Sequence, residues 1–132
     1  MNARLSTLRS KLRSAQLELP ALLEAFFARD PLLPGSVYTL RRKCGRPNCH
    51  CAEGSPHESE VLSYRGEGRP RNVSLPPREL DLARKMTEEY RAVRKARTQF
   101  VRWQRRVLEL LDSIEAARVR TGVDAFERTR PE

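Results

Sequence analysis

The sequence is poor in the residues that build a large hydrophobic core. Hydrophobic residues make up 39% of its 132 positions and aromatic residues only 6%, whereas charged residues reach 33%. This balance favours a helix-rich, elongated protein with much solvated surface over a compact sphere. No apolar run approaches the length that crosses a membrane, and the N-terminus lacks the apolar segment of a signal peptide. We therefore expect a cytoplasmic protein with no membrane partner.

Familiar catalytic patterns are missing as well. The sequence contains no Gly-rich phosphate loop, no Ser-His-Asp order and no carboxylate pair in a cleft-forming pattern. Its only two histidines, His50 and His57, stand among the cysteines. A small, extended chain also offers no obvious substrate pocket. We therefore expect a protein that is not an enzyme.

Cysteine is scarce, but its distribution is informative. All three cysteines and both histidines fall within residues 43–57. An odd number cannot form a complete disulfide set within one chain, and clustered thiols in a reducing cytoplasm are more often metal ligands. The spacing Cys-x4-Cys-x-Cys-x5-His predicts a structural Zn²⁺ site with four protein ligands and no open coordination position. The expected ligands are Cys44, Cys49, Cys51 and His57.

Two alternatives remain open at this segment. His50 is a rival fourth ligand, although its position between two ligating cysteines is unfavourable. The segment is also compatible with three reduced cysteines in a small core and two surface histidines. A redox function is disfavoured, because no thioredoxin-like pattern accompanies the cysteines.

Two segments have the heptad spacing of helices that pack in pairs. They cover residues 3–29 and 78–120, and we expect them to form an antiparallel coiled coil. Pro20 predicts a kink or a restart of the first helix, and Thr121-Gly122 predicts the end of the second. The first seam consists of Leu5, Leu8, Leu12, Ala15, Leu19, Leu22 and Phe26. The second contains Met86, Val93, Ala96, Phe100, Trp103, Val107, Leu110, Ile114 and Ala117.

Three short segments between these helices have strand-like composition. They cover residues 36–43, 60–65 and 69–75, and the last two flank a Gly-rich turn typical of a β-hairpin. Alternation places Tyr38 and Leu40, Leu62 and Tyr64, and Val73 and Leu75 on the candidate inner faces of these strands. The expected fold is α+β and mainly α, a helical hairpin with a zinc-stabilised three-stranded β module between its helices. The expected divisions are a helix in 1–34, the module in 35–76, the long helix in 77–120 and a flexible tail in 121–132.

The charge is strongly positive, with 26 basic and 17 acidic residues and a net charge of +9. Such a surplus favours polyanionic partners. One basic group lies on the module and another forms a strip on the long helix, opposite its apolar seam. The predicted nucleic-acid-binding residues are Arg41, Arg42, Lys43, Arg46, Arg65, Arg69, Arg71, Arg84, Arg91, Lys95, Arg102 and Arg106. The alternative is a coiled-coil adaptor whose zinc-bearing tip recruits an acidic protein. The unpaired length of the long helix also predicts a homo-oligomer or a hetero-complex.

One further indication comes from a resemblance. The stretch from Cys44 to Ala52, with Gly54, His57 and the run Leu62-Ser63-Tyr64-Arg65, resembles a family of small uncharacterised bacterial proteins often encoded beside transposases and other mobile-element genes. In that family Gly-Pro-Tyr usually follows the histidine, whereas Glu58-Ser59-Glu60 stands here. The resemblance implies a DNA-transaction setting and favours DNA over RNA. We therefore expect an accessory role beside a transposase or recombinase.

Overall fold

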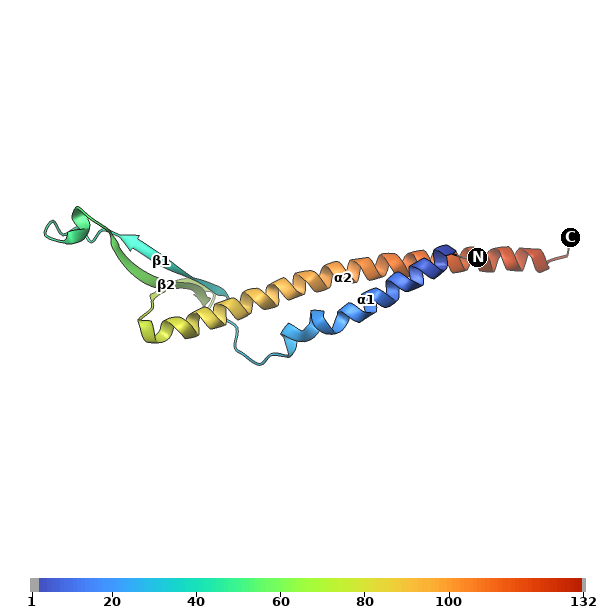
Figure 1. The fold of residues 1–132 in the computed structure, drawn as a ribbon, viewed down its shortest axis with the longest axis horizontal. Helices are drawn as coiled ribbons and strands as arrows, with labels where there is room; N and C mark the ends of the chain where they lie inside the picture. Colours follow the sequence, from blue (N-terminus) through green and yellow to red (C-terminus); the bar gives the residue numbers. More distant parts are fainter. Residues whose placement is uncertain (1–2, 132) are drawn as a thin grey trace. The chain divides into compact units, whose positions relative to one another are not determined.

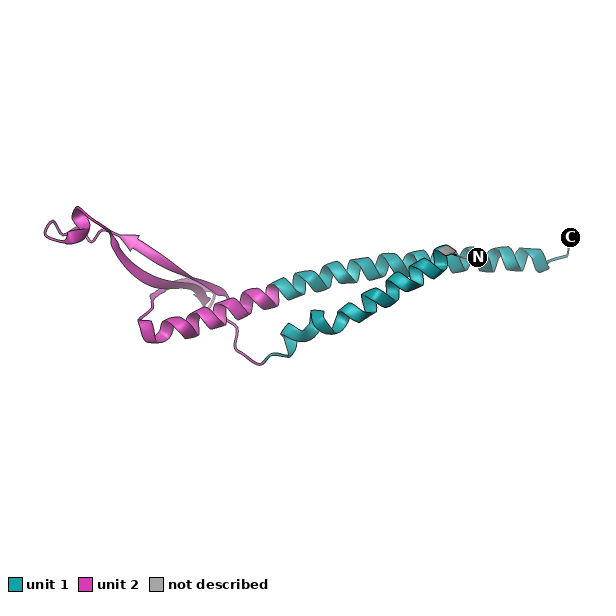
Figure 2. Ribbon diagram, in the orientation of Figure 1, with its two compact units in different colours: residues 1–28, 95–132 teal, residues 29–94 magenta. Residues whose placement is uncertain are grey.

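The chain contains two helices with a three-stranded antiparallel sheet between them in sequence order. The structure, a computed structural model, describes residues 3–131. The elements are α1 (Ala3–Phe27), β1 (Gly35–Arg42), a short 3-10 helix η1 (His50–Ala52), β2 (His57–Gly66), β3 (Arg69–Ser74) and α2 (Pro77–Thr129) (Figure 1). The predicted fold class, α+β and mainly α, is confirmed. Two compact units are present, one of residues 1–28 and 95–132 and the other of residues 29–94 (Figure 2).

The first unit is a pair of antiparallel helices, formed by α1 and the C-terminal part of α2 (Figure 2). Trp103 Nε1 donates a 2.7 Å hydrogen bond to the backbone oxygen of Ala15, the most buried residue of α1. The Arg106 guanidinium forms two 3.2 Å contacts with the Glu18 carboxylate. Apart from Phe26, every residue of the two predicted seams is buried or half-buried. The heptad spacing therefore identified the packing faces of both helices.

Both helices continue past the residues that were expected to interrupt or end them, Pro20 in α1 and Gly122 in α2. Helix α1 continues through Pro20 without a restart; Pro20 and Gln16 are exposed, so water can reach the Gln16 carbonyl group that Pro20 cannot bond. The predicted end of α2 at Thr121-Gly122 is wrong, because the helix continues to Thr129. Gly122 does not have the positive φ of a helix-terminating glycine. A single interior glycine costs only about 1 kcal/mol relative to alanine, which a long helix tolerates.

The sheet of the second unit has the order β1-β2-β3. Glu67 and Gly68 take positive φ values of 56° and 77° in the tight β2–β3 turn, as the predicted hairpin requires. Strand β2 already begins at His57, earlier than residue 60, so Glu58-Ser59-Glu60 is part of the strand.

The predicted faces of the sheet are partly wrong. Val37 pairs with Leu62, which in turn pairs with Val73, while Tyr38 pairs with Val61. Directly paired residues share a face, so Tyr38 lies on the face opposite Leu62 and Val73. The error arose because β1 carries apolar residues on both faces, and alternation alone could not select one.

The core of the second unit is small. Its buried residues are Cys51, Val61, Leu62, Ala83 and Thr87. Polar links supplement this core: Leu33 N–H donates to the Met86 carbonyl group at 3.1 Å, and ion pairs join Arg84 to Glu60 and Lys85 to Asp30, each at 3.6 Å. Exposed ion pairs add little stability, typically below about 1 kcal/mol. Because this core is small, a bound metal ion would supply a large share of the stability of the second unit.

Candidate metal centre

The cysteine-histidine segment forms a closed loop at one end of the β1–β2 pair. Arg42, the last residue of β1, pairs with His57, the first residue of β2, so the strands fix both ends of residues 43–56. Turns compact the loop: Cys49 N–H donates to the Arg46 carbonyl group at 3.2 Å, and Gly54 N–H donates to that of His50 at 2.9 Å. Gly45, near the start of the loop, has a φ of 83°, a backbone conformation that is strained for any residue with a side chain. Strand pairing and local turns together bring distant ligands to one point.

The four predicted ligands converge. One ligand atom from each of Cys44, Cys49, Cys51 and His57 lies within 4.8 Å of all the others. The Sγ atoms of Cys44 and Cys51 are 3.5 Å apart, and Cys49 Sγ is 3.0 Å from His57 Nε2. Zinc–sulfur bonds of about 2.3 Å place tetrahedral sulfur ligands about 3.8 Å apart. The donor set and its spacing, from 3.0 Å up to 4.8 Å, therefore fit a tetrahedral ion after small adjustments of the side chains.

Helix η1 explains how Cys49 and Cys51 reach the same point. In a regular strand these two side chains would face opposite ways. Here Cys49 is extended, with φ of −88° and ψ of 144°, and the chain then turns into η1, which contains Cys51. Ala52 N–H donates to the Cys49 carbonyl group at 3.1 Å and closes this turn. Cys51 is fully buried, whereas the other three ligands are more exposed.

Hydrogen bonds and burial act differently on the thiols. A hydrogen bond from the Arg46 backbone, supported by one from Cys51, lowers the pKa of Cys44 from 9.0 to about 6. The Cys44 N–H bonded to Cys51 Sγ at 3.4 Å lowers the pKa of Cys51, but burial and the neighbouring sulfurs outweigh it and raise that pKa overall. A metal ion that binds here would therefore find the Cys44 thiol easily ionised, whereas it would have to displace the proton of the Cys51 thiol.

His57, and not His50, is grouped with the cysteines. His50 Nδ1 is 3.8 Å from Cys49 Sγ, and its ring stands edge-on to His57, with centroids 5.1 Å apart. It does not belong to the set of convergent ligand atoms. The structure therefore favours His57 as the fourth ligand and places His50 beside the site.

This assignment predicts different effects for the two histidines. His57→Ala is expected to lower zinc affinity by about 100-fold or more, because it leaves three ligands. His50→Ala is the matched control and is expected to change affinity by less than about threefold, because it removes no ligand. Competition for zinc with a chromophoric chelator measures both constants. The opposite ranking of the two variants would show that His50 is the ligand.

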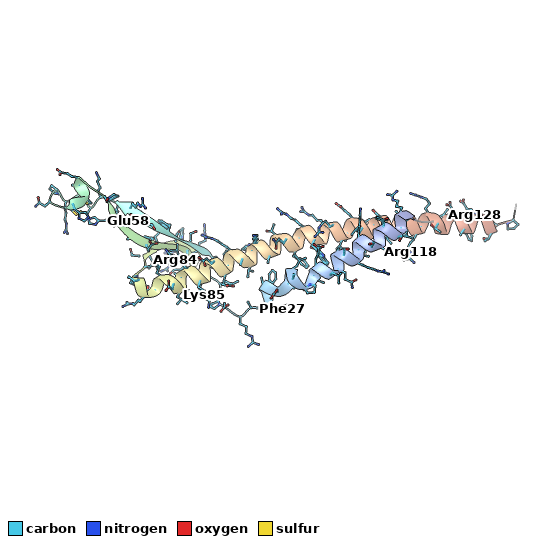
Figure 3. The ribbon with its side chains drawn as sticks, in the orientation of Figure 1. Phe27, Glu58, Arg84, Lys85, Arg118 and Arg128 are labelled. Carbon is cyan, nitrogen blue, oxygen red and sulfur yellow. The ribbon has the colours of Figure 1, made fainter. Side chains whose placement is uncertain are left out.

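The twelve predicted anion-binding residues divide into two groups. Four already have carboxylate partners: Arg41 with Glu58 at 3.1 Å, Arg71 with Glu67 at 3.3 Å, Arg84 with Glu60 at 3.6 Å and Arg106 with Glu18 at 3.2 Å (Glu58 and Arg84 are labelled in Figure 3). The other eight are exposed, and none forms an ion pair within residues 3–131. They are Arg42, Lys43, Arg46, Arg65, Arg69, Arg91, Lys95 and Arg102.

Two of these residues also belong to the metal loop. Lys43 Nζ donates to the Ala52 carbonyl group at 3.4 Å, so its ammonium group helps to hold the loop. Arg46 and Asn48 line an open depression with Cys44, Cys49 and His57. No sequence pattern predicts the contact of Lys43 with Ala52, because this contact depends on the turn through η1.

Comparison with known proteins identifies one family. Residues 5–85 match a family described as a domain of unknown function (DUF6788). The matched region includes α1, the sheet, the metal loop and the start of α2. No curated protein and no solved structure matches the chain. Among the described residues, no helix is both long and apolar enough to cross a membrane.

Proposed function

We propose that this chain, which belongs to the DUF6788 family, is a non-catalytic, zinc-stabilised accessory protein that binds nucleic acid. The observation that carries the proposal is the convergence of Cys44, Cys49, Cys51 and His57 at the end of a sheet that presents exposed arginines. The metal would order the loop, and the basic residues would contact phosphate groups.

Zinc is the metal that best suits this ligand set. Thiolates and imidazole are soft or borderline ligands, and three cysteines with one histidine are a common structural zinc set. Four protein ligands complete a tetrahedron, which leaves no position for a reactive water molecule. This closed coordination is why we assign the metal a structural role and the protein no catalytic one.

The distribution of charge supports an anionic partner. Eight of the predicted basic residues are exposed without an ion pair in the described chain, against four that have one. Arginine side chains contact phosphate with two parallel N–H groups, and a β-hairpin that carries them has a shape suited to a nucleic-acid groove. Arg65 and Arg69 flank the β2–β3 turn, Arg42 precedes the metal loop and Arg46 lies within it. These four side chains are the contacts that we propose for the module.

DNA is the nucleic acid that we favour. The described aromatic residues do not suggest a base-stacking platform, which argues against recognition of single strands. Tyr38 is exposed, but Trp103 is used in packing α1 against α2. The resemblance to proteins encoded beside mobile elements also favours DNA, with a transposase or recombinase as the associated enzyme.

An acidic protein is the second candidate partner. The observation in its favour is that Arg41, Arg71, Arg84 and Arg106 already bind carboxylates of their own chain. The same guanidinium groups suit the glutamates and aspartates of another protein. In that case the module would act as an adaptor.

Binding assays at increasing salt separate these candidates. We expect fluorescence anisotropy to show binding of labelled duplex DNA that weakens about 1,000-fold or more between 50 and 200 mM salt, as about six phosphate contacts require. Double-stranded RNA and poly-glutamate of matched charge serve as competitors. Equal competition by poly-glutamate would favour the adaptor. Absence of DNA binding at low salt would refute the proposal.

A further inference from the structure

The C-terminal part of α2 carries a second apolar face. Its large side chains remain between 43% and 63% exposed, although they are apolar. All of them lie beyond residues 5–85, the family match. The face consists of Leu108, Leu111, Val119, Val123 and Phe126.

This face is distinct from the seam that packs on α1. At about 100° per residue, Leu108, Val119 and Phe126 point within about 20° of one another. Val107 and Ile114, which belong to the seam, are half-buried and point in another direction. Residues of α1 line depressions with Leu110, Ser113 and Ala117 of α2, whereas the depression beside Leu111 and Val119 is lined by α2 residues alone. The second face therefore stays exposed while the first is covered.

The charges along this face are segregated. Glu115 precedes its middle and Arg118 follows it, and both line the depression beside Leu111 and Val119. Glu115 and Arg118 form no ion pair within the described residues, and Figure 3 labels Arg118 on α2. A glutamate before the middle of the face and an arginine after it are complementary to a copy of the same face in the reverse direction.

We propose that this face binds the same face of a second copy of the chain, with the two α2 helices antiparallel. A two-fold axis near Ala117 sets Leu108 opposite Phe126 of the partner subunit. The same axis brings Glu115 beside the partner's Arg118, twice by symmetry. A parallel pair would instead place Glu115 beside the partner's Glu115, so charge favours the antiparallel arrangement.

The length of the face sets the strength of the association. Residues 108–126 extend about 27 Å along the helix, which is shorter than the three to four heptads of a strong coiled coil. We therefore expect a dimer with a dissociation constant in the micromolar range. Dimerisation would double the basic surface offered to a polyanion and would raise avidity. This inference does not depend on the proposed function, because it concerns only the association of the chain with itself.

Sedimentation equilibrium on the full chain tests the inference. Between about 1 and 300 μM, the mass is expected to rise from that of the 15.2 kDa monomer to that of a dimer. Val119→Glu with Phe126→Glu is expected to weaken association at least tenfold, because it buries charge in the interface. Leu17→Glu is the matched control, since Leu17 is an apolar residue of α1 that is 81% exposed. A monomer at every concentration, or equal weakening by both changes, would overturn the proposal.

A charge exchange tests the orientation. Glu115→Arg is expected to weaken the dimer about tenfold by placing arginine beside the partner's Arg118. Adding Arg118→Glu is expected to restore association, because the complementary pair is re-formed with reversed polarity. Circular dichroism of each monomer checks that the helices remain folded. Failure of the double exchange to restore association would exclude the antiparallel arrangement.

Discussion

A strong chelator is expected to remove about one zinc ion per chain and to unfold the loop of residues 43–56, while most of the helical signal remains. The loop contains almost no apolar side chain besides the cysteines, and Cys51 is its one buried residue. A few turn hydrogen bonds cannot offset the entropy of ordering these residues, at about 1 kcal/mol or more per residue. Structural zinc contributes about 10 kcal/mol or more in small zinc modules. The metal is therefore the main source of order in the loop.

Substitution provides a second route to the same result. Cys49→Ser is expected to reduce the zinc content by most of one ion per chain, because serine is a poor zinc ligand. Asn48→Ser is the matched control, since Asn48 lies beside the site without belonging to the ligand set. Metal analysis measures the zinc, and hydrogen exchange measures protection of the loop. Full loop protection in the chelated protein would contradict the assignment of a structural metal.

Reversal of charge at Arg91, Lys95 and Arg102 is expected to weaken DNA binding by about 100-fold or more at low salt. Each of the three is exposed and forms no ion pair in the described part of the chain. If each contacts one phosphate, changing all three to glutamate also lowers the slope of log affinity against log salt by about three. The same substitutions are not expected to unfold the helix, because they lie outside its apolar seam.

The control for this experiment must carry the same net charge. Arg9→Glu, Lys11→Glu and Arg13→Glu change three exposed basic residues of α1 and shift the charge equally. Equal loss of affinity in both triple variants would indicate a diffuse effect of net charge and would remove the assignment to α2. A third variant, with Arg42, Arg65 and Arg69 changed to glutamate, measures the share of the β module. Its effect relative to the α2 variant identifies the principal contact surface.

The sequence was sufficient to predict the features that depend on the spacing of particular residue types along the chain. The heptads of both helices predicted the packing faces, because residues such as Ala15 and Trp103 recur at the period of a paired helix. The clustering of cysteine and histidine predicted the four convergent ligands for a chemical reason, since few other arrangements use these residue types so close together.

Other features were decided by interactions that spacing does not report. Strand β1 carries Val37 and Leu40 on opposite faces, so only its register with β2 determined where Tyr38 lies. Glycine is a common residue at the ends of helices, yet Gly122 lies inside α2. The choice between His50 and His57 required the turn through η1, which no local residue preference specifies.

The helix pair depends only weakly on the unit inserted within it. The bond from Trp103 to Ala15 joins residues 88 positions apart, so forming it closes a long stretch of chain. If residues 29–94 are already folded before the helices pair, only about a quarter of that stretch is still unfolded chain whose ends must be brought together. Loop-closure entropy grows slowly, by about 0.6 kcal/mol for each doubling of length, so losing the order of the insert costs the helix pair only about 1.2 kcal/mol. The paired parts of the two helices, residues 3–27 and 95–129, therefore tolerate unfolding of the metal-bearing unit at a small entropic cost.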